Sequence, residues 1–393
     1  MSYQFEGLIR EENSLGIYVH VPFCARKCNY CDFYSLAPGS DRDRRTYQMA
    51  VIDWLGCCAD HYAEDRVVDT VYFGGGTPSC YDAEKLAEIV QHIREYFALS
   101  HDCEITVECN PDSATEQWLQ TMKKAGVNRL SMGVQSANDE ELRLAGRLHD
   151  YATAKAAFHR AREAGFDNIS LDLIYGLPGQ TMQSWQHSVE ELLALAPEHL
   201  SCYGLKVEPG TPFWQQREML DLPDDDVQAD MYLWMVERLE QAGYGQYEVS
   251  NFAKPTRHSR HNMRYWLGQE YLGVGPGAHS YVDDERYAFT ANLEDFFRGV
   301  IGPWQNFTYG SKRIDDEERT REYIMLRMRT ALGICREEYE SRFGRCFDGL
   351  EKQLIIQGKY GWAAFEEGRW HFTPEGFLLS NALIGQLLEA MED

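Results

Sequence analysis

The sequence predicts an α/β fold of six strand–helix units, followed by a mainly helical, winged-helix-like C-terminal domain. Short apolar, β-rich runs alternate with amphipathic helical stretches in the first half of the chain, which is typical of parallel βαβ units. The runs are nearly continuous in apolar residues, as expected for strands that helices cover. Six units are fewer than the eight of a complete TIM barrel, so a partial (β/α)6 barrel and a doubly wound sheet both fit this pattern.

The expected elements follow one another in a regular order. The six strand-like runs are GIYVHVPF (16–23), VVDTVYFGGG (67–76), CEITVECN (103–110), NRLSMGVQS (128–136), NISLDLIYGLPG (168–179) and HLSCYGLKVE (199–208). The helices expected after the first five runs are 44–61, 83–97, 114–125, 139–164 and 182–195. The fourth of these helices is expected to break near Arg147.

The pattern changes after Glu208. The next stretch, PGTPFWQQREMLDLPDDD, is rich in Pro and Asp and predicts an irregular connection before a helix at 225–242. From Asp315 onward helices dominate, and GWAAFEEGRWHF near the end predicts a short hairpin. We therefore predict a tail at 1–15, the strand–helix domain at 16–215, a connecting region at 216–310 and the C-terminal domain at 311–393.

Composition excludes several classes of function. The net charge is −24, from 62 acidic and 38 basic residues, so the chain lacks the basic footprint of a general nucleic-acid binder. The first residues, MSYQFEGLIREENS, do not resemble a signal peptide, and no run of about 18 apolar residues predicts a membrane span. We expect a cytoplasmic protein whose 11 cysteines are mostly reduced thiols.

Three of these cysteines, Cys24, Cys28 and Cys31, lie within eight residues, directly after the first strand-like run. Clustered thiolates hold zinc or iron–sulfur centres. A structural zinc site uses four ligands, commonly as two pairs, and no matching CxxC pair follows. A 4Fe–4S cluster held by three cysteines leaves one iron open for chemistry, so this spacing favours such a cluster.

The segment CARKCNYC resembles the signature of the radical S-adenosylmethionine (SAM) enzymes. The resemblance implies a 4Fe–4S cluster whose open iron binds the amino and carboxylate groups of SAM, and it favours the partial barrel. It also implies that a glycine-rich stretch after the second strand approaches SAM. Here this stretch reads YFGGGTP (72–78), and glycines let a main chain come close to a ligand.

Polar side chains also stand at the carboxyl ends of later strands, where α/β folds place their sites. They narrow the resemblance to the branch of oxygen-independent coproporphyrinogen III oxidase. In that branch, matching residues contact SAM, which implies the same role here for Tyr18, Gly75, Gly76, Thr77, Glu108, Gln135, Arg147 and Asp172. Tyr30, inside the cysteine motif, is assigned to the same SAM site.

Two departures from the oxidase point to its sister group, the HemW-type heme chaperones. Phe33 stands where the oxidase has a further cysteine, and only 23 residues precede Cys24. The motif HNMRYW (261–266) fits the HNxxYW motif of that group. The resemblance implies heme as a ligand, with the candidate residues His261, Asn262, Tyr265 and Trp266. His279 and His149 are further candidates, and His258 is a candidate for a second metal site if its segment is helical.

We therefore predict a radical SAM-type heme chaperone that binds heme and transfers it to acceptor apoproteins, with a 4Fe–4S cluster and SAM retained. One alternative is an oxygen-independent coproporphyrinogen III oxidase, which forms protoporphyrinogen IX by radical decarboxylation. Another is a radical SAM enzyme that acts on a tetrapyrrole or methylates a substrate. The expected partners are heme or another tetrapyrrole, heme-accepting apoproteins, an electron donor and, transiently, membrane proteins, with no nucleic acid among them.

Overall fold

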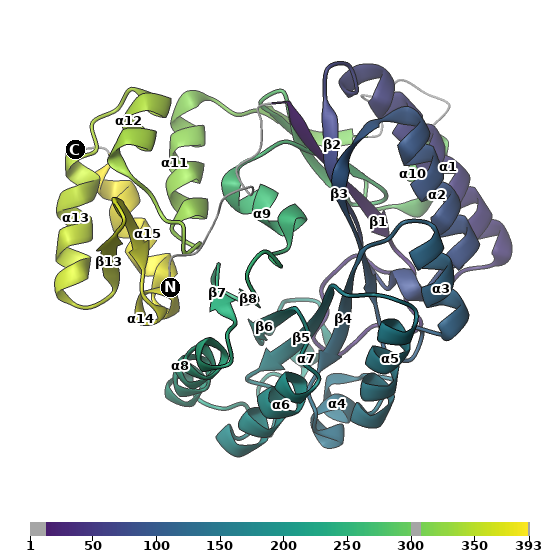
Figure 1. Cartoon of the computed structure of the whole chain (residues 1–393), viewed down its shortest axis with the longest axis horizontal. Coiled ribbons are helices and arrows are strands. Elements are labelled where there is room, and N and C mark those ends of the chain that lie inside the picture. Colours follow the sequence, from purple (N-terminus) through teal and green to yellow (C-terminus); the bar gives the residue numbers. More distant parts are fainter. Residues whose placement is uncertain (1–12, 300–307, 392–393) are drawn as a thin grey trace. The chain divides into compact units, whose positions relative to one another are not determined.

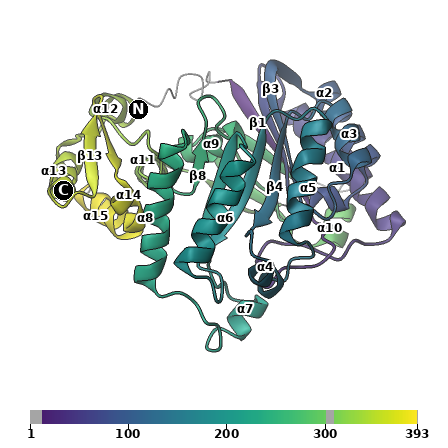
Figure 2. The ribbon, with the colours of Figure 1, turned by 60° about the horizontal axis from the view of Figure 1, so that its bottom comes forward.

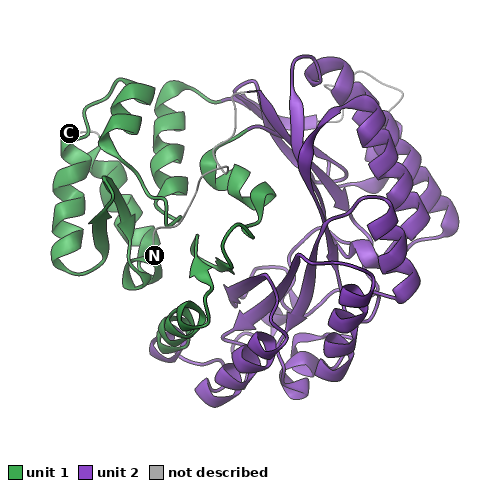
Figure 3. Cartoon of the chain, viewed as in Figure 1, with its two compact units in different colours: residues 1–10, 229–269, 314–393 green, residues 11–228, 270–313 purple. Residues whose placement is uncertain are grey.

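The computed structural model describes residues 13–299 and 308–391, which fall into two compact units (Figure 3). The barrel unit comprises residues 13–228, 270–299 and 308–313. The C-terminal unit comprises residues 229–269 and 314–391. The domain boundaries expected at 215 and 310 stay a prediction, and most of the expected tail lies outside the described residues.

Six parallel strands form the main sheet of the barrel unit, and each pairs with the next one along the chain (Figure 1). They are β1 (Ser14–Val21), β2 (Val67–Gly75), β3 (Ala98–Cys109), β4 (Arg129–Gln135), β5 (Ile169–Tyr175) and β6 (His199–Gly204). Parallel pairing brings all six carboxyl ends to one edge. The helices of these units line the outer side of the curved sheet (Figures 1 and 2), which confirms the partial barrel and not a doubly wound sheet.

Most helices of the barrel unit begin where the sequence supplies a capping side chain. Ser40 and Asp43 form a capping box at the start of α1. The α4–α5 gap confirms the break expected near Arg147, because Gly146 ends α4 with a φ of 80°. The bounds are α1 (Asp41–Tyr62), η1 (Pro78–Cys80), α2 (Ala83–Tyr96), α3 (Glu116–Lys124), α4 (Asp139–Ala145), α5 (Tyr151–Glu163), α6 (Met182–Ala194), α7 (Pro212–Gln215) and α10 (Leu293–Gly299).

Four further strands extend the sheet beyond β1, and the sequence patterns did not predict them. They are β9 (Tyr271–Val274), β10 (His279–Val282), β11 (Glu285–Phe289) and β12 (Thr308–Arg313). β9 pairs in parallel with β1, and β10 to β12 continue the sheet as antiparallel strands. Each is only four to six residues long and pairs far along the chain, so local periodicity carries little signal for it.

The two faces of this sheet differ in character. Alternate residues such as Ile17, Val19 and Val21 are fully buried and pack toward the helices. The residues between them form an inner face that is polar, with Tyr18 and Tyr72 stacked at 6.2 Å and Glu108 nearby. The outer face therefore supplies the apolar core, and the inner face presents the chemistry.

The C-terminal unit is mainly helical with short hairpins, as predicted. Its elements are most of α8 (Asp225–Gln241), β7 (Gly245–Gln246), β8 (Asn251–Ala253), α9 (Arg260–Leu267), α11 (Asp316–Arg327), α12 (Arg336–Phe343), α13 (Asp348–Lys359), β13 (Ala363–Glu366), β14 (Arg369–Phe372), α14 (Pro374–Leu378) and α15 (Ser380–Ala390). β13 and β14 pair as the expected hairpin. No helix within residues 13–299 and 308–391 is long and apolar enough to cross a bilayer.

The close approach of β9 and β10 depends on Gly273. A Cβ atom at this position would lie 2.0 Å from the main-chain oxygen of His279. We expect Gly273→Ala to lower the free energy of unfolding by about 3 kcal/mol, because overpacking forces the two strands apart. Urea unfolding followed by circular dichroism measures this, with Gly56→Ala in α1 as the control. Equal midpoints for Gly273→Ala and the wild type would contradict the assigned packing.

Candidate functional site

The cysteine loop, residues 22–40, leaves the carboxyl end of β1 and is tied down at several points. The main-chain N–H of Cys24 donates to the oxygen of Leu36 at 2.8 Å, which closes the loop on itself. Asn29 donates to the end of α4 through its main chain, at 3.0 Å from the Ala145 oxygen. The guanidinium of Arg26 donates to the Gly146 oxygen at 2.6 Å. The three free thiols of Cys24, Cys28 and Cys31 are thus held at the carboxyl edge of the sheet.

The glycine-rich turn after β2 is hydrogen-bonded to the start of this loop. Gly76 N–H donates to the Val21 oxygen at 2.9 Å, and Thr77 N–H donates to the Phe23 oxygen at 2.8 Å. A Cβ atom at Gly76 would lie 2.7 Å from that Phe23 oxygen, so only glycine permits this approach. Gly75 adopts a φ of 109°, and a Cβ there would lie 2.4 Å from the ring of His20.

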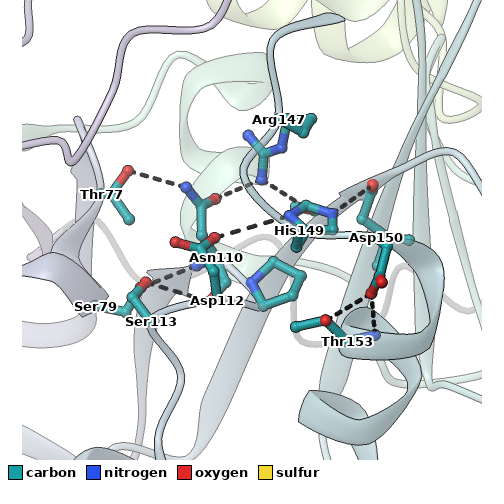
Figure 4. Close-up of polar contacts among 12 residues, drawn as sticks. Thr77, Ser79, Asn110, Asp112, Ser113, Arg147, His149, Asp150 and Thr153 are labelled. Atoms are coloured by element: carbon teal, nitrogen blue, oxygen red, sulfur yellow. Dashed lines mark hydrogen bonds and ion pairs between the residues drawn. The ribbon is translucent and has the colours of Figure 1, made fainter. Parts of the chain in front are cut away.

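A polar chain leads from Thr77 in the glycine turn through Asn110 to Arg147 (Figure 4), and Arg147 in turn contacts the cysteine loop. The Asn110 amide donates to the Thr77 hydroxyl at 3.2 Å, and its oxygen accepts from Arg147 at 2.8 Å. Arg147 also donates to the Gly133 oxygen at 2.7 Å and lies 3.4 Å from the sulfur of Cys28. The sulfur of Cys24 lies 3.1 Å from the Thr77 hydroxyl oxygen. Two predicted residues, Thr77 after β2 and Arg147 after α4, are therefore joined through Asn110 and contact two of the three cysteines.

Two partly buried carboxyl groups lie on the inner face beside this chain. Glu108 accepts hydrogen bonds from the Tyr72 hydroxyl at 2.8 Å and from Gly75 N–H at 3.2 Å. Burial raises the pKa of Glu108 to about 7, although these hydrogen bonds favour its ionised form. Asp172 accepts from the Ser131 hydroxyl at 3.1 Å, and burial raises its pKa as well. The carboxyl oxygens of both groups can accept hydrogen bonds from a ligand.

The remaining predicted SAM residues lie around the same edge. The Tyr18 hydroxyl lies 3.0 Å from Nδ1 of His20, within the inner face. Tyr30 is partly buried and packs against a cluster that includes Ala145. Gln135 ends β4 with a φ of 71°, a left-handed conformation that is strained for a residue with a side chain. All the predicted SAM residues belong to the barrel unit.

His149 has a structural environment in the barrel unit. It is buried, its Nε2 atom lies 3.2 Å from the Val134 oxygen, and its Nδ1 atom lies 3.8 Å from Asp112 (Figure 4). These contacts hold the segment that carries Arg147. This environment favours a supporting role for His149 over heme ligation.

The HNMRYW motif lies within α9 in the C-terminal unit. The imidazole of His261 is fully buried, and its Nε2 atom lies 2.9 Å from the Tyr265 hydroxyl oxygen. Asn262 and Trp266 are partly exposed. His258 precedes the Ser259 N-cap and therefore lies outside the helix, and burial lowers the pKa of His258 to about 4. Within the described ranges, no three His, Cys, Asp or Glu side chains converge as a metal site.

Comparison with known proteins places this architecture in a family. The chain is 35% identical to the heme chaperone HemW of Bacillus subtilis, over 94% of this chain and 98% of that protein. The chain belongs to the HemW family. It is also 39% identical to the heme chaperone HemW of Mycobacterium tuberculosis, over 95% of this chain and 94% of that protein. These alignments cover nearly the full length of both partners, so the two units are shared with the HemW relatives.

Family models and a solved structure agree with this membership. Residues 18–192 match the radical SAM superfamily, and residues 314–379 match the HemN C-terminal domain. The structure of coproporphyrinogen III oxidase (HemN) from Escherichia coli, a radical SAM enzyme, superposes with a TM-score of 0.81 at 26% identity, covering 98% of this chain and 91% of that chain. Membership of the radical SAM superfamily implies a 4Fe–4S cluster and SAM.

The residues of the barrel unit fit these two groups. Three free thiols on one loop would supply thiolate ligands to a cluster, and the glycine turn beside them admits no Cβ atom. Glu108 and Asp172 are acceptors, and Arg147 is a cation for a carboxylate. The thiol of Cys24 contacts Thr77, and the thiol of Cys28 contacts Arg147. To ligate one cluster, the thiols would therefore have to turn toward a common centre.

The sequence patterns missed two residues that organise the site. Asn110 links Thr77 to Arg147, and Tyr72 donates to Glu108. The sequence does carry a signal for Tyr72. Side chains two residues apart on a strand point to the same face, so Tyr72 shares the face of Gly74 in the glycine-rich stretch. For Asn110 the signal is its place directly after β3 and before a proline.

The raised pKa of Glu108 predicts a pH dependence of stability. An unfolded chain loses this proton near pH 4.5, whereas the folded chain retains it to about pH 7, so its contribution to stability falls as pH rises between these values. We expect the free energy of unfolding of Glu108→Gln, relative to that of the wild type, to rise by roughly 3 kcal/mol from pH 4.5 to pH 8. Urea unfolding at both pH values measures this.

The control for this experiment is Glu218→Gln, since the Glu218 side chain is 88% exposed. Tyr72, Asp172 and Arg129 face Glu108 and are present in the wild type and in Glu108→Gln. Their own contributions to the pH dependence of stability therefore cancel when the two proteins are compared. A constant difference between Glu108→Gln and the wild type at the two pH values would contradict the assigned burial of the carboxyl group.

Proposed function

We propose that this protein binds heme and transfers it to acceptor apoproteins, and that it carries a 4Fe–4S cluster and SAM in the barrel unit. The near full-length similarity to heme chaperones HemW from several bacteria carries the proposal. Phe33 adds to it, because this side chain occupies the place of the oxidase's additional cysteine and is 64% exposed on the cysteine loop. A phenyl ring there supplies neither a ligand nor a proton.

The residues of the barrel unit have separate proposed roles. Cys24, Cys28 and Cys31 hold the cluster, which in radical SAM enzymes supplies the electron that cleaves SAM. The main chain of Gly75 and Gly76 lies against SAM, together with Thr77. The other SAM contacts are Tyr18, Tyr30, Glu108, Gln135, Arg147 and Asp172. In this arrangement Arg147 faces the SAM carboxylate, and Glu108 and Asp172 accept hydrogen bonds from its polar groups.

The proposed heme residues of the C-terminal unit are His261, Asn262, Tyr265 and Trp266. Ligation by His261 requires its hydrogen bond with Tyr265 to open, since the imidazole is fully buried. The proposed partners are heme, heme-accepting apoproteins, an electron donor and, transiently, membrane proteins. Partly exposed aromatic side chains beside a histidine are suited to a planar, apolar ring.

A second candidate function is oxygen-independent coproporphyrinogen III oxidation. The superposition on HemN from Escherichia coli favours it, since that match spans both units. The two functions differ in the fate of the tetrapyrrole, which is bound and released unchanged in one and decarboxylated in the other. They are therefore separable by product analysis.

The test uses anaerobically reconstituted protein with SAM and a strong reductant, divided between coproporphyrinogen III and hemin. We expect a stable hemin complex that passes heme to apomyoglobin, and no protoporphyrinogen IX. The E. coli coproporphyrinogen III oxidase serves as the positive control for turnover. Formation of protoporphyrinogen IX by this protein, or a changed mass of the recovered heme, would contradict the chaperone function.

A further inference from the structure

The antiparallel strands β10 to β12 continue the inner face of the barrel unit. Tyr18 on β1 pairs with Gly273 on β9, and Tyr271 on β9 pairs with Tyr281 on β10. Directly opposed residues share a face and alternate residues return to it, so His279 lies on the same face as Tyr18. The side chain of His279 is exposed. A histidine therefore stands on the extension of the proposed SAM face.

Cationic and aromatic side chains surround this histidine. Across the strand pairs, Arg286 opposes both Tyr281 and Lys312, and the guanidinium of Arg286 lies 5.4 Å from the centroid of the Tyr281 ring. Tyr309 opposes Ala288, which in turn opposes His279, and Tyr309 is 52% exposed. We call this group the β10–β12 face; its members are His279, Tyr281, Arg286, Tyr309 and Lys312.

The chemistry of the β10–β12 face matches an iron porphyrin with two propionates. An imidazole nitrogen ligates iron, the exposed ring of Tyr309 packs on a planar macrocycle, and two cations neutralise two carboxylates. Tyr281 is buried beneath Arg286 and supports that cation. Three adjacent strands span about 10 Å, which gives the ring a platform.

The other candidate histidines lack this accessibility. His149, His258 and His261 are buried, whereas His279 is exposed. A bulky ligand reaches an exposed imidazole without opening the packed core. Ligation by any of the three buried rings requires local rearrangement first.

The β10–β12 face also adjoins the cysteine loop. The turn before His279 packs on the end of β1, where a Cβ atom at Gly275 would lie 2.5 Å from the oxygen of His20. A Cβ atom at Gly277 would lie 3.8 Å from Cβ of Tyr34, three residues after Cys31. His279 thus follows a turn fixed against the strand and the loop that carry the proposed cluster ligands.

We propose that the β10–β12 face binds heme in the barrel unit and that His279 ligates its iron. This inference rests on the proposed function. It gives heme a second binding location, in addition to the one proposed at the HNMRYW motif. Heme in this position lies on the extended inner face of the sheet that holds the SAM residues.

The test compares hemin with iron-free protoporphyrin IX, titrated against the wild type and His279→Ala. We expect His279→Ala to weaken hemin binding at least tenfold and to shift the Soret band. Affinity for protoporphyrin IX stays within twofold, because that ring has no iron to ligate. The matched control is His187→Ala, which removes an exposed histidine from α6 on the outer side of the barrel unit.

His279→Met provides a second variant that retains a potential iron ligand. We expect it to bind hemin with a spectrum different from that of the wild type. An unchanged affinity and Soret band in His279→Ala would overturn this assignment alone, and so would a full loss of binding seen only in His261→Ala. A wild type that binds no hemin would overturn the proposed function as well.

Discussion

The site depends on a main-chain contact between the end of β1 and the glycine turn after β2. Two hydrogen bonds join Val21 to Gly76 and Phe23 to Thr77, and they leave no room for a Cβ atom at Gly76. This contact places the sulfur of Cys24 against Thr77, from which the Asn110–Arg147 chain leads to Cys28. A side chain at the turn would separate the cysteine loop from the sheet and disconnect this chain.

The polar inner face that accompanies this contact is unfavourable for folding. Glu108 and Asp172 are partly buried carboxyl groups, and the loss of solvent raises the pKa of both by disfavouring their charged forms. Arg129 is 1% exposed, and its Nε atom has no hydrogen-bond partner. Unpaired buried polar atoms are costly, so such an arrangement is typical of a ligand site and not of a structural core. The apolar outer face, packed against the helices, provides the compensating stability.

Much of this organisation is predictable from the sequence because it is local. The spacing of Cys24, Cys28 and Cys31 and the alternation of strands and helices are short-range patterns, and parallel pairing then gathers the strand ends at one edge. Strands β9 to β12 are not local, because β9 reaches β1 across more than two hundred residues. The burial of His261 was equally hidden, since a motif does not show whether its side chains face the core. The exposure of His279 became visible only with the strand register.

The most direct test of the account is the magnetic coupling between the reduced cluster and bound SAM. Pulsed electron–nuclear double resonance on reconstituted protein, with SAM labelled at its amino nitrogen and carboxylate carbon, reports whether both groups lie at the iron. The proposed site predicts coupling to both labels, because the glycine turn and Arg147 lie beside the cysteine loop. A reduced cluster that shows no coupling to either label would contradict the assignment of this edge of the sheet as the SAM site.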